Sequence, residues 1–228
     1  MALGTTGEIL IKKPNQAVVG TAHPRRVRRP HTADVRAQGR HEQKQFTNEL
    51  IDKIKPVIVD AQIKAGVSVL YEMPIDDDGR VQMGVDQHSG EAIRGKGTGF
   101  EQDVLIFEEK TEGNTSIIPR VIIEIKYAGV TTHDAIVYSY KAESIKRVYP
   151  FVRFGMVIGG FKTIPVRLLR LGRQFDFIMA MEHPFVDTQV DELRTIATDE
   201  LSISRSLGSV LQGKRKLRIL RKHWTINE

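Results

Sequence analysis

The chain contains five short runs rich in apolar, β-branched and aromatic residues, and each run predicts a β-strand. The runs lie at residues 67–73, 100–107, 121–127, 152–158 and 175–181. The third run, Val-Ile-Ile-Glu-Ile-Lys-Tyr, is so rich in β-branched residues that we expect it to form a central strand of a sheet.

Two other stretches place apolar residues at helical spacing. In the first, at about residues 41–54, Phe46, Leu50 and Ile54 recur every four residues, which predicts a helix with one apolar face. The second predicted helix covers about residues 132–149 and ends before Pro150. Its candidate core positions are Ile136, Tyr140 and Ile145. The predicted order is one helix, three strands, a second helix and two more strands, which indicates an α/β protein.

The third strand carries two charged residues, Glu124 and Lys126, in the middle of its apolar run. Because side chains alternate across a strand, we expect Glu124 and Lys126 on one face and Ile123 and Ile125 on the other. The preceding strand carries Asp103. Three charged side chains are therefore predicted to converge on one small region of the sheet.

Such a convergence has a chemical use, because two carboxylates can hold a hard divalent cation such as Mg²⁺ through their oxygen atoms. A bound cation polarises a phosphoryl oxygen and lowers the pKa of a bound water molecule. A neighbouring lysine can orient that water. The pattern of Asp103, Glu124 and Lys126 therefore predicts a metal-dependent nuclease site, and the alternative is a partly buried Glu–Lys ion pair with Asp103 at a strand edge.

The Glu-x-Lys pattern itself is not specific, since it also occurs at residues 42–44 and 108–110. Glu42 lies in a polar stretch of the first predicted helix, and Glu108 leads into a hydrophilic turn. On the second predicted helix, Lys141 is the best secondary candidate for the active site or for a DNA contact. The alternative for Lys141 is an ordinary exposed helix lysine.

Composition and charge favour nucleic acid as the partner. The chain has 228 residues, 40% of them hydrophobic, a formal net charge of +6 and no cysteine, so disulfides and thiolate metal sites are excluded. Basic clusters at residues 25–29 and 214–222 suit contacts with DNA phosphates, although each alone could be a solvated tail. No apolar run is long enough for a membrane span and no secretory signal is evident, so we expect a cytoplasmic protein with no membrane partner.

The predicted domain organisation is simple. Residues 1–38 have little periodicity and form a basic N-terminal extension or arm, and residues 39–228 form the catalytic domain with recognition loops and a basic C-terminal segment. Residues 80–99 lack a clear core pattern and are a candidate DNA-contacting loop. In the C-terminal cluster, the spacing of Leu217 and Leu220 predicts that part of the segment packs on the domain.

The segment of about residues 39–160 resembles the PD-(D/E)xK nuclease superfamily. The resemblance is carried by Asp103 ahead of Val-Leu-Ile-Phe, by Glu124 and Lys126 in Ile-Glu-Ile-Lys, and by the helix that follows. It implies the restriction-endonuclease-like fold, an αβββαβ core with a central mixed β-sheet flanked by helices. The departure from the pattern is Gln102, where many members have proline.

The resemblance also implies roles for individual residues. Asp103 and Glu124 would bind Mg²⁺, for which Mn²⁺ can substitute, the carbonyl of Ile125 would complete the coordination, and Lys126 would assist the attacking water. Members often place a further glutamate on the first helix, and Glu42 in Gly-Arg-His-Glu looks similar. Glu49 is its rival, and a solvated surface acid is the alternative for both.

The function expected from the residues and the resemblance is a Mg²⁺-dependent DNA endonuclease, a type II restriction enzyme that cuts double-stranded DNA as a homodimer. A junction resolvase or a transposon-end nuclease is the alternative within nucleases. A DNA-binding module of the same fold that does not cleave is a further alternative, and the presence of all three charged residues argues against it. The basic clusters argue against a small-molecule metal hydrolase.

Overall fold

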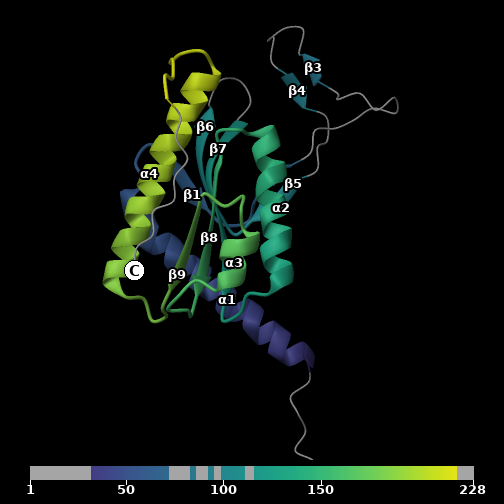
Figure 1. Ribbon diagram of the computed structural model, residues 1–228, viewed down its shortest axis with the longest axis vertical. Coiled ribbons are helices and arrows are strands. Elements are labelled where there is room, and N and C mark those ends of the chain that lie inside the picture. The colour runs from purple at the N-terminus through teal and green to yellow at the C-terminus, as the bar shows by residue number, and fades with distance from the viewer. Residues whose placement is uncertain (1–31, 72–82, 86–91, 95–98, 111–115, 220–228) are drawn as a thin grey trace, which may run out of the picture.

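The fold is built on a central sheet of five strands with helices on both faces (Figure 1). The computed structural model describes residues 32–71, 83–85, 92–94, 99–110 and 116–219. The strands follow the order β1-β6-β7-β8-β9 across the sheet. They are β1 (Gln62–Lys64), β6 (Val104–Lys110), β7 (Ser116–Tyr127), β8 (Arg153–Gly159) and β9 (Phe177–Met181).

The sheet is mixed, because its strands pair in both senses. Strands β1, β6 and β7 are antiparallel neighbours, whereas β7, β8 and β9 run parallel to one another. Parallel strands need long crossovers, and helices α2 (Thr132–Val148) and α3 (Val166–Leu171) lie in the two crossovers from β7 to β9. The predicted α/β class and the central mixed sheet flanked by helices are confirmed.

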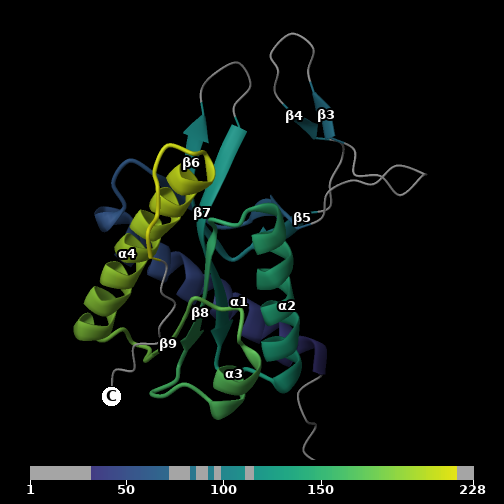
Figure 2. The same ribbon diagram turned by 45° about the horizontal axis from the view of Figure 1, so that its top comes forward.

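Each face of the sheet has its own apolar cluster. On one face α1 (Thr32–Ile54) and α4 (Asp187–Leu211) pack against the sheet, and on the other face α2 and α3 do so (Figure 2). The first cluster contains Phe46, Leu50, Ile54, Ile123, Ile125, Leu193 and Leu201. The second cluster contains Leu105, Ile122, Ala142, Ile145, Phe154 and Leu168. Strand β7 is therefore covered on both sides, as its continuous apolar run requires.

The strand predicted at residues 67–73 is not the first central strand. Strand β2 (Val67–Leu70) pairs with β5 (Gly99–Gln102) in a separate two-stranded sheet, and the first central strand is β1. The β1–β6 pair and the β2–β5 pair follow one continuous antiparallel register. The two pairs are therefore parts of a single two-stranded ribbon, which is interrupted where Gly66 lies opposite Asp103. Gly66 has a φ of +70°, which glycine adopts without strain and which bends the ribbon at this point.

The first helix begins at Thr32 rather than at about residue 41, so the last part of the predicted N-terminal arm is helical. The basic cluster at residues 25–29 lies outside the described residues. Strands β3 (Met83–Val85) and β4 (Ala92–Arg94) form a small antiparallel pair within the predicted DNA-contacting loop. The other residues between 80 and 98 lie outside the described part of the chain.

Helix α2 covers the predicted span, but two of its three predicted core positions are wrong. Ile145 is fully buried, whereas Ile136 and Tyr140 are 53% and 59% exposed. The buried face carries Ala135 and Ala142 instead. Their small side chains let the helix approach the sheet closely, which the spacing of the larger residues does not reveal.

The C-terminal region contains a long helix that the sequence prediction lacks. Helix α4 buries Val190, Leu193, Ala197 and Leu201 against the sheet, and it ends at Leu211. The exposed residues 212–219 that follow are not helical, and Leu217 is 52% exposed, so the expectation that it packs on the domain is wrong. Leu220 lies outside the described residues. Among the helices that the structure describes, none is long and apolar enough to cross a membrane.

Candidate functional site

The site begins where strands β6 and β7 part. The ladder between them ends at Val104, which pairs with Ile123, and Asp103 lies in the break between β5 and β6. The Asp103 carboxylate accepts a hydrogen bond from the backbone N–H of Ile125 at 2.8 Å. A residue in a strand points its N–H and C=O to the same side, so the Ile125 carbonyl faces this same edge of β7.

Glu124 lies between Ile123 and Ile125 on β7. Its side chain points to the α2 face of the sheet, away from the face of its two neighbours, as the alternation of side chains along a strand predicts. The residue is only 4% exposed. Its burial, together with the nearby negative charge of Asp103, raises the pKa of the Glu124 carboxyl from 4.5 to about 7, although the Lys141 ammonium acts in the opposite direction. Glu124 is therefore held near a second carboxylate, Asp103, in a place where water stabilises the charge of Glu124 poorly.

Lys141 reaches this pair from α2. Its Nζ donates to Glu124 Oε2 at 2.9 Å and to the backbone carbonyl of Glu101 at 3.0 Å. The Lys141 and Glu124 side chains are 8% and 5% exposed, so the ion pair is buried. A buried pair of this kind is costly to break from one side only, because the remaining charge would have no partner.

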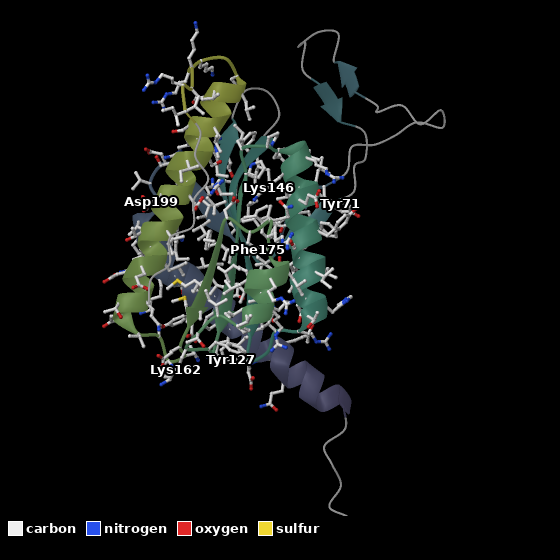
Figure 3. All side chains as sticks on the ribbon, in the orientation of Figure 1. Tyr71, Tyr127, Lys146, Lys162, Phe175 and Asp199 are labelled. Atoms are coloured by element: carbon white, nitrogen blue, oxygen red, sulfur yellow. The ribbon has the colours of Figure 1, made fainter. Side chains whose placement is uncertain are left out.

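A cleft of about 390 Å³ opens beside the ion pair, between α2 and the bent ribbon. The residues that line it are Phe100, Glu101, Asp103, Glu124, Val137, Tyr138 and Lys141. Figure 3 shows the side chains that fill the space between α2 and the sheet, with Tyr71 beside α2 and Tyr127 at the end where β7 finishes. The cleft combines carboxylates, an ammonium group and aromatic rings, which is a lining suited to a polar ligand.

Lys126 lies on the same face of β7 as Glu124, but it is not among the residues that line the cleft. Its Nζ donates to the Tyr138 hydroxyl at 2.6 Å and lies 4.4 Å from the centroid of the Tyr138 ring. Burial lowers the pKa of Lys126, but the Tyr138 hydrogen bond and the charges of Glu124 and Asp103 outweigh it, so the pKa is raised. Lys126 is therefore protonated at neutral pH and is joined to the cleft through Tyr138.

The two candidate glutamates of α1 are not brought to this cleft, since α1 packs on the opposite face of the sheet. Glu42 is partly exposed and accepts a hydrogen bond from Gln38 at 3.1 Å. Glu49 contacts His183 at 3.1 Å and accepts from Gln45. The structure thus brings together Asp103, Glu124, Ile125 and Lys126 without either helix glutamate, and a catalytic role for Glu42 remains a prediction.

The sequence prediction lacks two features of the site, namely the presence of Glu101 and the pairing of Lys141 with Glu124. Side chains alternate along a strand, so Glu101 lies on the same side as Asp103, which follows it by two residues. This signal could have added Glu101 to the candidates. The pairing of Lys141 with Glu124 joins residues 17 positions apart through the packing of α2 on the sheet. No local pattern identifies that contact.

The residues present fit a divalent cation. Burial and, after it, the nearby charge of Asp103 raise the pKa of Glu124, and a cation bound by both carboxylates would remove the repulsion between them. The Ile125 carbonyl supplies a third oxygen on the same strand edge. Within the described part of the chain there is no group of three or more His, Asp or Glu side chains that could hold a metal ion, so such a site would depend on two carboxylates and a backbone carbonyl.

Comparison with known proteins gives no relative from which a function could be transferred. No protein-family model matches the chain. No curated protein sequence matches it significantly either.

The first prediction concerns pH in the absence of divalent cations. Between about pH 4.5 and pH 7 the Glu124 carboxyl is protonated to a greater extent in the folded protein than in the unfolded chain, because folding raises its pKa. The contribution of Glu124 to the free energy of unfolding is therefore present below about pH 4.5 and lost as the pH rises to about 7, by up to about 3 kcal/mol. Urea unfolding across this pH range measures it.

The Glu124→Gln variant should lack this loss of stability, because its amide does not titrate. Glu143→Gln is the matched control, since Glu143 lies on α2 in an exposed ion pair with Arg147. The assignment would be wrong if Glu124→Gln and Glu143→Gln showed the same pH dependence.

Proposed function

We propose that this chain is a Mg²⁺-dependent endonuclease that hydrolyses phosphodiester bonds in double-stranded DNA, and that it acts as a site-specific type II restriction enzyme. The observation that carries the proposal is that Asp103, which is bonded to the Ile125 N–H, and Glu124 line one cleft together with a buried lysine, Lys141. This set of groups matches the needs of phosphodiester hydrolysis, which are a cation site, a positive charge and room for a phosphate.

The order of elements supports the restriction-endonuclease-like core. When β2 to β5, which lie outside the central sheet, are left aside, helix α1 is followed by the antiparallel strands β1, β6 and β7, then by α2 and the parallel strand β8, and this order agrees with an αβββαβ core. Asp103 directly precedes the second of these three strands, and Glu124 and Lys126 lie on the third. The homodimeric state belongs to the proposal, since two copies are needed to cut both strands of a palindromic site.

Asp103, Glu124 and the Ile125 carbonyl are the groups that would hold Mg²⁺. When bound, the cation would polarise a phosphoryl oxygen and lower the pKa of an attacking water molecule. The chain's own part is to hold the two carboxylates in place. The Ile125 N–H orients Asp103 through its hydrogen bond, and the Lys141 ammonium favours the charged form of Glu124.

Lys126 supplies a second positive charge near the reacting groups. Its ammonium is held by the Tyr138 hydroxyl, and Tyr138 itself lines the cleft. A lysine placed in this way can stabilise negative charge that develops on a phosphate, because burial strengthens its field relative to water. Lys126 therefore retains the role of assisting the attacking water in the proposed mechanism.

Contacts with DNA outside the cleft would come from the basic segments. Lys214, Arg215 and Lys216 are exposed in the segment that follows α4, and this segment lies at the end of the molecule where β6 ends and β7 begins (Figures 1 and 2). Lysine and arginine on a surface bind phosphates without regard to sequence, and they account for much of the affinity of DNA-binding proteins. The net charge of +6 agrees with an anionic partner.

One observation favours the alternative of a DNA-binding module that does not cleave. The Lys141 ammonium already neutralises Glu124 in a buried ion pair, and a structural pair of this kind needs no metal. Cleavage assays with and without divalent cations distinguish the two functions, because a module would bind DNA equally well and leave it intact in both.

The second prediction is that Asp103→Ala and Glu124→Ala each reduce the rate of DNA cleavage by at least about a hundredfold, since each removes a cation ligand. DNA binding should change little, because neither carboxylate contacts a phosphate favourably. Cleavage of mixed-sequence duplex DNA with Mg²⁺ or Mn²⁺ measures the rate, and excess chelator should abolish it.

Glu143→Ala is the control for this experiment, as it removes an exposed α2 carboxylate outside the cleft. Glu42→Ala in the same assay tests the helix glutamate that the resemblance suggests. A rate within about tenfold of the parent for Asp103→Ala or Glu124→Ala would contradict the site assignment.

The third prediction concerns the exposed basic residues after α4. Replacing Lys214, Arg215 and Lys216 together by glutamine should weaken binding to all DNA sequences about equally. The slope of log affinity against log salt concentration should fall by about 0.9 for each lost phosphate contact, up to about 2.7. Titrations at several salt concentrations measure this. An unchanged slope would show that the segment is a solvated tail.

A further inference from the structure

The cation that a ligand would meet in the cleft is Lys141. Its Nζ is held by Glu124 Oε2 at 2.9 Å and by the Glu101 carbonyl at 3.0 Å. The rings of Phe100 and Tyr138 lie 5.3 and 5.6 Å from the same nitrogen, measured to their centroids. Lys141 is thus fixed by specific partners at the wall of the cleft, and it is not an ordinary surface lysine.

Lys126 differs from Lys141 in its position. Its Nζ is directed to the Tyr138 hydroxyl, and the residue does not line the cleft. Tyr138 therefore stands between the Lys126 ammonium and a bound ligand. Of these two lysines on the α2 face, Lys141 is the one that shares an oxygen atom with the proposed cation site.

That shared oxygen creates a competition. Carboxylate and carbonyl oxygens bind hard divalent cations, and Lys141 already uses one of each. Two cations that lie within a few ångströms of each other in a poorly solvated cleft repel strongly. A divalent cation on Asp103 and Glu124 would therefore weaken the Lys141–Glu124 ion pair and compete for the same carboxylate.

We propose that Lys141 is the counter-ion of Glu124 before the metal binds, and that a divalent cation breaks this ion pair and frees the ammonium to bind the substrate phosphate beside Asp103. This inference rests on the proposed nuclease function. Because a coupling between two ligands is reciprocal, a phosphate that binds Lys141 would also strengthen cation binding. The positive charge for the substrate would then become available only when the metal is in place.

Chemical labelling of the unaltered protein tests the inference without cleavage. Lysine acylation by a small amine-reactive reagent is followed by mass spectrometry, with Mg²⁺ alone as the probe and no DNA present. Lys141 should react several-fold faster at saturating Mg²⁺, because its amine loses its partner. Lys146 is the matched control on the same helix. Its ion pair with Asp176 lies away from the cleft, so Lys146 should react at an unchanged rate.

The outcomes separate the two proposals. Binding of Mg²⁺ measured by calorimetry, with no change in the reactivity of Lys141, would overturn this inference and leave the proposed function standing. Failure of Mg²⁺ to bind the protein would overturn both.

A second experiment uses Lys141→Met, which keeps the apolar stem and removes the charge, and Lys141→Arg, which keeps the charge. Lys141→Met should bind Mg²⁺ more tightly because the competing cation is gone, yet cleave DNA more slowly. Lys141→Arg should restore part of the cleavage rate. Weaker Mg²⁺ binding in Lys141→Met would show that the lysine only supports the site, and it would overturn the inference.

Discussion

The site depends on one hydrogen bond, the donation of the Ile125 N–H to the Asp103 carboxylate. This N–H lies beyond the last pair of the β6–β7 ladder, so the carboxylate takes the place of a strand carbonyl. A buried N–H without a partner would be costly, so Asp103 contributes to stability as well as to the proposed chemistry. The same contact allows the β2–β5 ribbon to leave the sheet, and the departure opens the cleft under α2.

The second constraint is electrostatic. When all four groups are ionised, Asp103 and Glu124 carry two negative charges that Lys126 and Lys141 balance. The balance is local, since Lys126 is held by Tyr138 and Lys141 by Glu124. A site with this balance is stable without a ligand, and a divalent cation together with an anionic phosphate can enter it with little change in net charge. The raised pKa of Glu124 shows how incomplete the compensation is before such ligands bind.

Much of this arrangement follows from the sequence of β7. The alternation of Glu124 and Lys126 with Ile123 and Ile125 predicts the faces correctly, because period two is intrinsic to an extended strand. Strand β1 escaped prediction, since three residues that read Gln-Ile-Lys carry no usable pattern. The bend at Gly66 and Asp103 escaped as well, because the pattern of residues 100–107 predicts one strand, whereas the structure divides them between β5 and β6.

The contacts made by the helices were the least predictable part. Polarity alone would place Lys141 at the surface and Ile136 in the core, yet Lys141 is buried and Ile136 is exposed. The difference comes from the buried carboxylate of Glu124, which draws the lysine inward, and from the small residues that α2 places on the sheet. Glu42 shows the reverse case. A sequence likeness suggests it for the site, but α1, which carries it, packs on the opposite face of the sheet from the cleft.

The central claim is that Asp103, Glu124 and the Ile125 carbonyl form a divalent cation site. Anomalous X-ray diffraction from crystals soaked in Mn²⁺ tests it most directly, because the scattering locates the ion without relying on activity. The account predicts a single strong peak within bonding distance of an oxygen of each of these three residues. A protein that binds Mn²⁺ elsewhere, or shows no peak in this cleft at saturating Mn²⁺, would contradict it.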